Sequence, residues 1–105
     1  MNAQLKKGLL DVCVLSVLSR GESYGYKILK DLTPYVDLSE STLYPILRRL
    51  EAGGCLTVRS IEHEGRLRKM YAITPSGHQQ IRDFLEDWKE VQRIYHYIEE
   101  GETHE

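Results

Sequence analysis

Apolar residues recur with a helical period in the middle of the chain. Within residues 41–51 they lie at one position and then three, four and seven positions after it. This spacing places them on one stripe of a helix, which we expect to be buried. The stripe consists of Leu43, Ile46, Leu47 and Leu50. Ser39 or Ser41 is suited to cap this helix. Because Pro45 lacks an N–H and crowds the preceding turn, the first turn is expected to be irregular.

A second helix is predicted over residues 23–32, where the same spacing puts Gly25 on the apolar stripe. Ser23 is positioned to cap this helix. A glycine on a buried face lowers helix propensity by about 1 kcal/mol, and it lets another backbone approach closely. Pro34 ends the helix. The two helices together have the arrangement of a helix-turn-helix unit.

Two β-rich runs follow the central helix at once, over residues 56–62 and 67–73, and Gly65 permits a turn between them. Their alternation of apolar and polar residues is imperfect. We therefore expect a hairpin that is anchored near Leu56 and Ile73 and exposed at its tip. A helix followed directly by a hairpin, with arginines on both, predicts a winged helix-turn-helix.

A long helix is predicted to close the chain, with Thr74 as its N-cap, Pro75 at the first position and Gly101 as its end. Its apolar residues are spaced alternately three and four positions apart, as in a heptad stripe. They are Ile81, Phe84, Trp88, Val91, Tyr95 and Ile98. A helix of roughly 25 residues spans nearly 40 Å, more than a small domain covers. We expect part of the stripe to meet a second copy of the chain; the alternative is a helix packed only on its own domain.

The first helix is apolar nearly all round from Leu9 onward, as a helix covered on more than one side would be. One face is expected to close the core, and another, including Leu9, to receive the terminal helix of a partner. The run is too short and interrupted to span a membrane, so a cytoplasmic protein is expected. The predicted fold is mostly α with a small β-hairpin (α+β): a winged-helix DNA-binding domain over residues 1–75, then a dimerisation helix and acidic tail over residues 76–105.

Charge is distributed unevenly in a chain of 105 residues whose formal net charge is −2. Residues 41–70 contain six Lys and Arg against three Asp and Glu, whereas residues 83–105 contain eight acids against two bases. Cations on a helix and on an adjacent hairpin together suit a DNA backbone. Taken alone, the arginine pair of the helix is more typical of a solvated surface, and the cations of the hairpin do not decide between the two. The candidate DNA contacts are Lys27, Ser41, Thr42, Tyr44, Pro45, Arg48, Arg49, Arg66, Arg68 and Lys69.

No catalytic, metal or cofactor site is expected. The two cysteines, Cys13 and Cys55, lack the spacing of a zinc site and are interpreted as reduced thiols. The four histidines are dispersed along the chain, at His63, His78, His96 and His104. The chain shows neither a Gly-rich phosphate loop nor a set of nucleophile, base and orienting group.

Three segments resemble the PadR transcriptional regulators, and the single terminal helix resembles that of the short subfamily. They are Ser23–Ile28, residues 41–54 with Thr-Leu-Tyr-Pro followed by Arg-Leu-Glu, and residues 68–77 ending in Thr-Pro-Ser-Gly. The resemblance implies an N-terminal winged helix, a homodimer joined through the C-terminal helices, and repression of nearby genes that a small molecule relieves. Met70 stands where an additional tyrosine is common in the family.

Trp88 has two possible roles. At a heptad position it can serve packing alone. In multidrug-binding members of the short subfamily a similarly placed tryptophan from each subunit lines a flat pore where planar aromatic ligands stack. The resemblance therefore implies a ligand site made by Val12, Ser16, Leu85, Trp88 and Gln92. Gln92 occurs where those members can carry an acid, so a preference for cations is not implied.

The sequence predicts a dimer that binds a pseudo-palindromic operator in double-stranded DNA. The resemblance implies that this dimer is a repressor and that a planar aromatic effector tunes it. A winged helix that binds proteins without binding DNA is the main alternative. An enzyme or a direct metal sensor is a more distant one.

Overall fold

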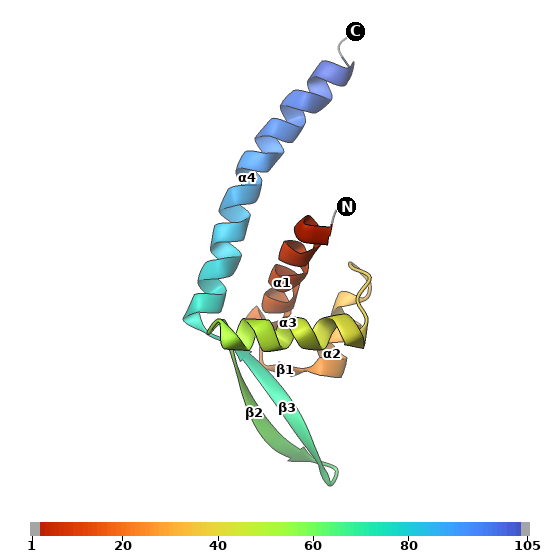
Figure 1. Cartoon of the computed structure of the whole chain (residues 1–105), viewed down its shortest axis with the longest axis vertical. Coiled ribbons are helices and arrows are strands. Elements are labelled where there is room, and N and C mark those ends of the chain that lie inside the picture. Colours follow the sequence, from red (N-terminus) through yellow and green to blue (C-terminus); the bar gives the residue numbers. More distant parts are fainter. Residues whose placement is uncertain (1–2, 104–105) are drawn as a thin grey trace.

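The computed structural model describes the backbone of residues 3–103 and the side chains of residues 8–103. Residues 1–2 of the predicted DNA-binding domain and residues 104–105 of the predicted acidic tail, including His104, lie outside the described residues. Four helices and a small antiparallel sheet follow one another along the chain (Figure 1). The elements are α1 (Ala3–Ser19), β1 (Ser23–Tyr24), α2 (Gly25–Leu32), α3 (Glu40–Ala52), β2 (Leu56–His63), β3 (Arg66–Ile73) and α4 (Pro75–Thr103). The predicted fold class, a winged helix with a long C-terminal helix, is confirmed.

The core lies between the first three helices and one face of the sheet. The apolar stripe predicted for α3 is buried at all four positions. The first helix adds five buried side chains, which are Leu10, Val14, Leu15, Val17 and Leu18. Removing such side chains from water is the main favourable contribution to folding, at about 25 cal/mol per Å² of apolar surface. No described helix has the combination of length and apolar character that crossing a bilayer requires.

The start of α3 differs from the sequence prediction. Ser39 is the N-cap, but its hydroxyl lies 2.9 Å from that of Ser41 and makes no hydrogen bond to a backbone N–H. The helix then runs without a break from Glu40 through Pro45, so the expectation of an irregular first turn is wrong. The carbonyl that loses its donor to Pro45 is that of Ser41. Because Ser41 is exposed, water can satisfy this group, which keeps the cost of the proline low.

A third strand, β1, was not predicted. It pairs with β3 through Ser23↔Tyr71 and Tyr24↔Met70, which gives the strand order β1-β3-β2. Ser23 is therefore a buried strand residue and not the cap of α2, whose N-cap is Tyr24 without a capping side chain. A strand of two residues is too short to produce a detectable alternation of apolar and polar side chains.

The hairpin agrees closely with its prediction. The strands are in register from Leu56↔Ile73 to His63↔Arg66, one residue longer at the tip than expected. Glu64 and Gly65 form the turn, with φ angles of 52° and 76°. Two consecutive residues with positive φ are typical of the tight hairpin turn whose twist matches that of the strands. Between its tip and Met70 the hairpin has no third strand beside it, and this part projects from the body as a wing (Figure 1).

The terminal helix begins as predicted and ends later. The Thr74 hydroxyl accepts a hydrogen bond from the Gly77 N–H at 3.2 Å and donates one to the Gly54 carbonyl at 2.6 Å. Gly101 does not end α4, which continues to Thr103 for a total of 29 residues. A single glycine costs only about 1 kcal/mol in a helix, too little to stop it. The predicted boundary between residues 75 and 76 falls in the first turn of α4; as a domain boundary it stays a prediction.

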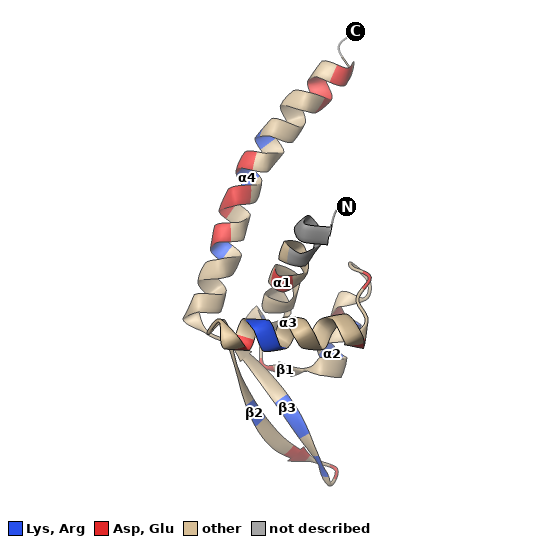
Figure 2. Cartoon of the chain, in the orientation of Figure 1, with Lys and Arg blue, Asp and Glu red and all other residues tan. Residues whose placement is uncertain are grey.

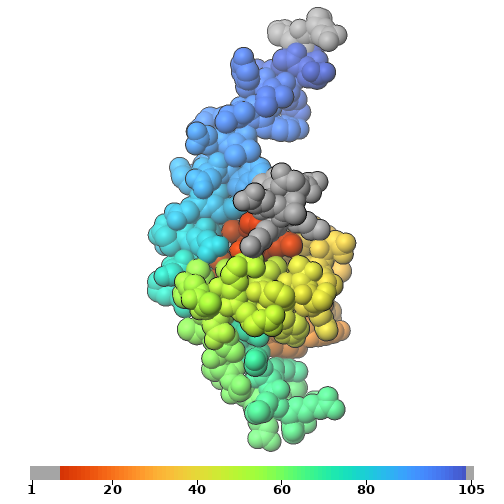
Figure 3. Space-filling view, in the orientation of Figure 1, coloured from red at the N-terminus to blue at the C-terminus, as the bar shows by residue number. Residues whose placement is uncertain are grey.

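Much of α4 has no neighbour in the chain. The molecule measures 65 × 26 × 21 Å, and the long dimension follows α4 (Figure 1). The first turns of α4 pack beside α1. From Lys89 to Thr103 every described residue is exposed, and Figure 3 shows this part rising past the rest of the chain. As expected, α4 is longer than the part of it that its own chain covers.

The first turn of α4 yields a stability prediction. A Cβ atom at the buried Gly77 would collide with the backbone carbonyl oxygen of Cys55 and lie 2.6 Å from a side-chain carbon of Ile73. We expect Gly77→Ala to lower the free energy of unfolding by about 1–3 kcal/mol, as overpacking does. Urea denaturation measures the change. Gly101→Ala is the matched control, because a Cβ there meets nothing within 4 Å; a Gly77 variant as stable as this control would contradict the prediction.

Candidate nucleic-acid interface

The predicted cations lie on two neighbouring surfaces. Figure 2 shows basic residues on α3 and along β3, while acidic residues follow α4 away from the body. On α3 the exposed face carries Ser41, Tyr44, Pro45 and Arg48, with Thr42 at its margin. On the wing, Arg66 and Lys69 are exposed. The burial of the opposite stripe of α3 is what turns these polar residues outward.

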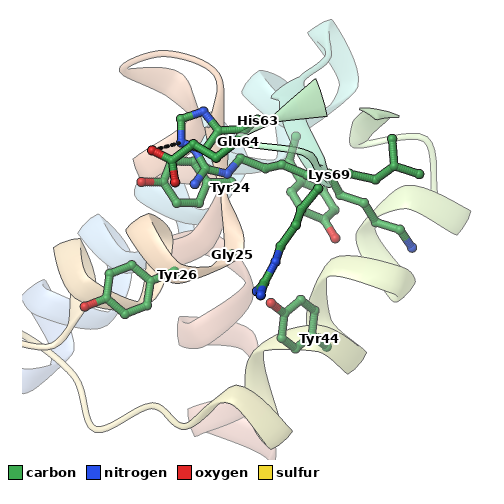
Figure 4. A pocket seen from close by; sticks show the side chains of 11 residues that line it. Tyr24, Gly25, Tyr26, Tyr44, His63, Glu64 and Lys69 are labelled. Atoms are coloured by element: carbon green, nitrogen blue, oxygen red, sulfur yellow. Dashed lines mark ion pairs between the residues drawn. The ribbon is translucent and has the colours of Figure 1, made fainter. Parts of the chain in front are cut away.

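A hollow of about 820 Å³ separates the wing from the helices (Figure 4). Tyrosines from four different positions and cations from β3 share its walls. The lining residues are Tyr24, Gly25, Tyr26, Tyr44, His63, Glu64, Arg66, Leu67, Arg68, Lys69 and Tyr71. Phenol hydroxyls and cationic side chains donate hydrogen bonds to phosphate oxygens. The chemistry of the hollow therefore suits an anionic chain of phosphates.

Gly25 shapes one wall of the hollow. A Cβ atom at this position would lie 2.5 Å from the hydroxyl oxygen and 3.0 Å from the ring carbon that bears it in Tyr44. The sequence predicted a close approach at Gly25, but to another backbone; the group that approaches is the phenol of α3. The missing side chain lets Tyr44 lie against the start of α2, with 39% of the residue still exposed. The tyrosine is thereby held beside the hollow, as Figure 4 shows.

A second, smaller hollow joins the two basic surfaces directly. Its volume is about 270 Å³, and its lining includes Arg48 and Glu51 from α3 together with Lys69 and Tyr71 from β3. Burial raises the pKa of the Tyr71 hydroxyl, with a smaller contribution from the nearby Tyr44. One cation of the helix, Arg48, and one of the hairpin, Lys69, thus border the same space.

Two contacts on the outer face of the sheet brace the wing where its third strand ends. The guanidinium of Arg68 lies 3.9 Å from the centre of the Tyr24 ring, a cation–π contact. Arg59 donates to both carboxylate oxygens of Glu22, at 2.9 and 2.5 Å. The hydrogen bond from Arg59 lowers the pKa of the Glu22 carboxyl. The roles of Glu22, Tyr24 and Arg59 were not predicted from the sequence, because without β1 nothing placed these residues near the wing.

Two other predicted cations are paired within the chain. Lys27 lies 3.4 Å from Asp31 one turn later on α2, and both side chains are about half exposed. Such surface pairs contribute little, so Lys27 remains available to another partner. Arg49 is different, because it forms an ion pair with Asp11 of α1. Its neighbour Arg48 points outward, so the two consecutive arginines of α3 face different surroundings.

The predicted ligand and dimer residues lie on α1 and α4. Val12 and Ser16 are half-buried on α1, whereas Leu85 and Gln92 are exposed on α4. Trp88 is half-buried, and its ring centre lies 5.8 Å from that of Phe84. Among the predicted dimer residues, Leu9 and Ile81 are half-buried. Val91, Tyr95 and Ile98 expose 43%, 58% and 63% of their surface.

The described residues contain no group of three or more His, Cys, Asp or Glu that could hold a metal ion.

Comparison with known proteins places these features in a family. Residues 14–83 match the transcriptional regulator PadR-like family. The negative transcriptional regulator PadR of Bacillus subtilis (strain 168) is 33% identical over 82 residues, which cover 73% of this chain and 45% of that protein.

Solved structures show the same fold. A PadR family transcriptional regulator from Eggerthella lenta DSM 2243 superposes with a TM-score of 0.82 at 32% identity, over 92% of this chain and 87% of that one. Bacillus subtilis PadR in complex with operator DNA gives a TM-score of 0.69 at 30% identity, over 73% of this chain and 46% of that one.

Proposed function

The chain belongs to the PadR-like family of transcriptional regulators, and on that premise we propose that it binds operator DNA as a homodimer and represses transcription in the cytoplasm. The observation that carries the proposal is the arrangement of α3 and the wing, whose cations and tyrosine hydroxyls border shared hollows. A relative of this chain has been solved with operator DNA bound.

The proposed contacts divide by chemistry. Arg48, Arg66 and Lys69 are exposed cations that neutralise phosphates, and they supply affinity that does not depend on sequence. Ser41, Thr42 and Tyr44 lie in the first turns of α3, the part of a recognition helix that contacts base edges or phosphates. Pro45 adds an apolar surface beside them. In this division the wing positions the protein and α3 reads the sequence.

The main alternative is a winged helix that binds another protein. The walls of the larger hollow are rich in hydroxyls and cations and contain only one aliphatic side chain, Leu67. The centre of a protein interface is enriched in tyrosine and arginine as well, so the composition of this hollow suits either kind of partner. The preference for a nucleic acid rests on the family and on the relative that was solved with operator DNA.

We expect the double substitution Arg48→Ala/Arg66→Ala to weaken DNA binding strongly. Each phosphate contact that is removed should lower the slope of log K against log salt by about 0.9, so the slope should fall by up to about 2. Fluorescence anisotropy with duplexes selected from the organism's genomic DNA measures both quantities. Lys89→Ala, which removes an exposed cation from α4, is the control and should bind as the wild type does. Failure of the wild type to bind any duplex at low salt would defeat the proposal.

Dimerisation is proposed from the uncovered stripe of α4. Leu85, Val91, Ile94 and Ile98 expose between 43% and 63% of their surface along one helix. Contiguous apolar surface of this kind marks an interaction site, and heptad spacing suits a second helix. A two-fold dimer would place two copies of α3 on successive half-sites of a pseudo-palindromic operator.

The double substitution Val91→Glu/Ile98→Glu should therefore convert a dimer into a monomer, because it buries two carboxylates in an apolar seam. Sedimentation equilibrium at micromolar concentration measures the change. Arg93→Glu introduces the same charge on the opposite side of α4, where Arg93 is exposed, and should leave the dimer intact. A wild-type chain that sediments as a monomer would overturn this part of the proposal.

The proposed function includes a planar aromatic effector. Its basis is the half-buried pair of Trp88 and Phe84 beside Leu85, on the part of α4 that packs near α1. In a dimer, Trp88 and its symmetry mate would present broad aromatic faces on which flat molecules stack. Val12, Ser16 and Gln92 would border the same space.

Titration with flat aromatic compounds should quench the fluorescence of Trp88, the single tryptophan of the chain. The physical reason is direct stacking of the ligand on the indole ring. The monomeric Val91→Glu/Ile98→Glu variant is the control, and it should lose the response because the seam is absent. A broad panel of compounds that leaves the wild-type spectrum unchanged would indicate that Trp88 serves packing only.

A further inference from the structure

We propose that Arg49 is a positioning residue, which fixes the orientation of α3 through Asp11 and does not contact DNA. This inference rests on the proposed DNA-binding function and assigns to Arg49 a role different from that of its neighbour Arg48. From the sequence alone, both arginines are candidate DNA contacts. Their surroundings in the structure differ.

The Arg49–Asp11 pair joins two helices that lie far apart in the sequence. A guanidinium nitrogen of Arg49 donates to a carboxylate oxygen of Asp11, 38 positions earlier on α1. The Asp11 side chain is only 15% exposed and that of Arg49 is 39% exposed. A carboxylate that has lost most of its water is costly unless a charged donor compensates it. Asp11 therefore holds Arg49 at the side of α3 that faces α1.

Burial of the apolar stripe sets the approximate rotation of α3, and a polar contact can refine it. The hydrophobic effect depends on area, so small rotations and shifts of α3 that keep the stripe buried change it little. A hydrogen-bonded ion pair has a required distance and angle. Placed at the edge of the apolar contact, it selects one rotation and one sliding position of α3 relative to α1. Those two variables decide where the exposed face of α3 points.

The geometry of a helix makes this division of labour possible. Consecutive residues are separated by about 100° around the helix axis. With Arg49 directed toward α1, Arg48 lies on the exposed face and borders the hollow that it shares with Lys69 and Tyr71. A change in the rotation of α3 would move Arg48 and Tyr44 together relative to the wing. DNA affinity is therefore expected to depend on the ion pair although neither of its members contacts DNA.

The test compares Asp11→Asn, Arg49→Ala and their combination, using the duplex on which the wild type binds best. Each single variant should weaken DNA binding about tenfold, and the double variant should be no weaker than either single one, because the same contact is lost each time. The slope of log K against log salt should stay at the wild-type value. Asp11→Asn is the most informative variant, since removing an acidic charge would by itself favour binding to DNA.

Arg48→Ala is the matched control, because it removes the neighbouring guanidinium and should lower the salt slope by about 0.9. If Arg49→Ala lowers the slope in the same way, while Asp11→Asn binds as well as or better than the wild type, then Arg49 is a phosphate contact and the inference is overturned. Arg49→Lys keeps the charge in case Arg49→Ala folds poorly; a positioning role predicts weaker binding with an unchanged slope for this variant too.

A readout that needs no DNA separates this inference from the proposed function. In a double-mutant cycle on the midpoint of urea denaturation, the effects of Asp11→Asn and Arg49→Ala should be clearly less than additive. Additive effects would show that the pair does not join α1 to α3, and would overturn the inference whether or not the chain binds DNA. Coupled effects in a chain that binds no duplex would defeat the proposed function, and with it the role of the pair in DNA binding.

Discussion

The burial of one stripe of α3 is the constraint on which the rest of the structure depends. Four aliphatic side chains at helical spacing are removed from water, and the opposite face of the same helix is then necessarily exposed. Ser41, Tyr44 and Arg48 occupy that face. The polar chemistry of the interface is thus a geometric consequence of the core, since α3 cannot turn these groups inward without exposing its stripe.

The wing is placed relative to α3 by a few contacts of different kinds. At its base, the buried side chains of Leu56 and Tyr71 belong to the core. Where the two-residue β1 ends, the hairpin would be a two-stranded ribbon, which is marginally stable alone. The stacking of Arg68 on Tyr24 and the two hydrogen bonds from Arg59 to Glu22 occur at that point. The core therefore holds the α3 wall of the hollow in place, and these contacts hold the wall formed by the wing.

The sequence predicted those features that periodicity or local chemistry dictates. The buried stripe of α3, the anchor of the hairpin at Leu56 and Ile73, and the capping of α4 by Thr74 were all predicted correctly, because each depends on residues that are close in the chain. The contacts that orient the surfaces were not predicted. Arg49 meets Asp11 across 38 positions and Arg59 meets Glu22 across 37, and no spacing rule links residues so far apart. The continuation of α4 past Gly101 was also missed, because a glycine lowers helix propensity without stopping a helix.

The position of α1 suggests how a signal at the seam would reach the DNA-binding surface. One side of α1 packs against α4, and another side carries Asp11, which is paired with Arg49 of α3. An effector beside Val12 and Trp88 alters DNA affinity only if it binds two arrangements of these helices with different affinity. In the role proposed here for the ion pair, a shift of α1 would also displace α3. The free energy of binding the proposed effector and that of binding DNA would then be coupled through this polar contact.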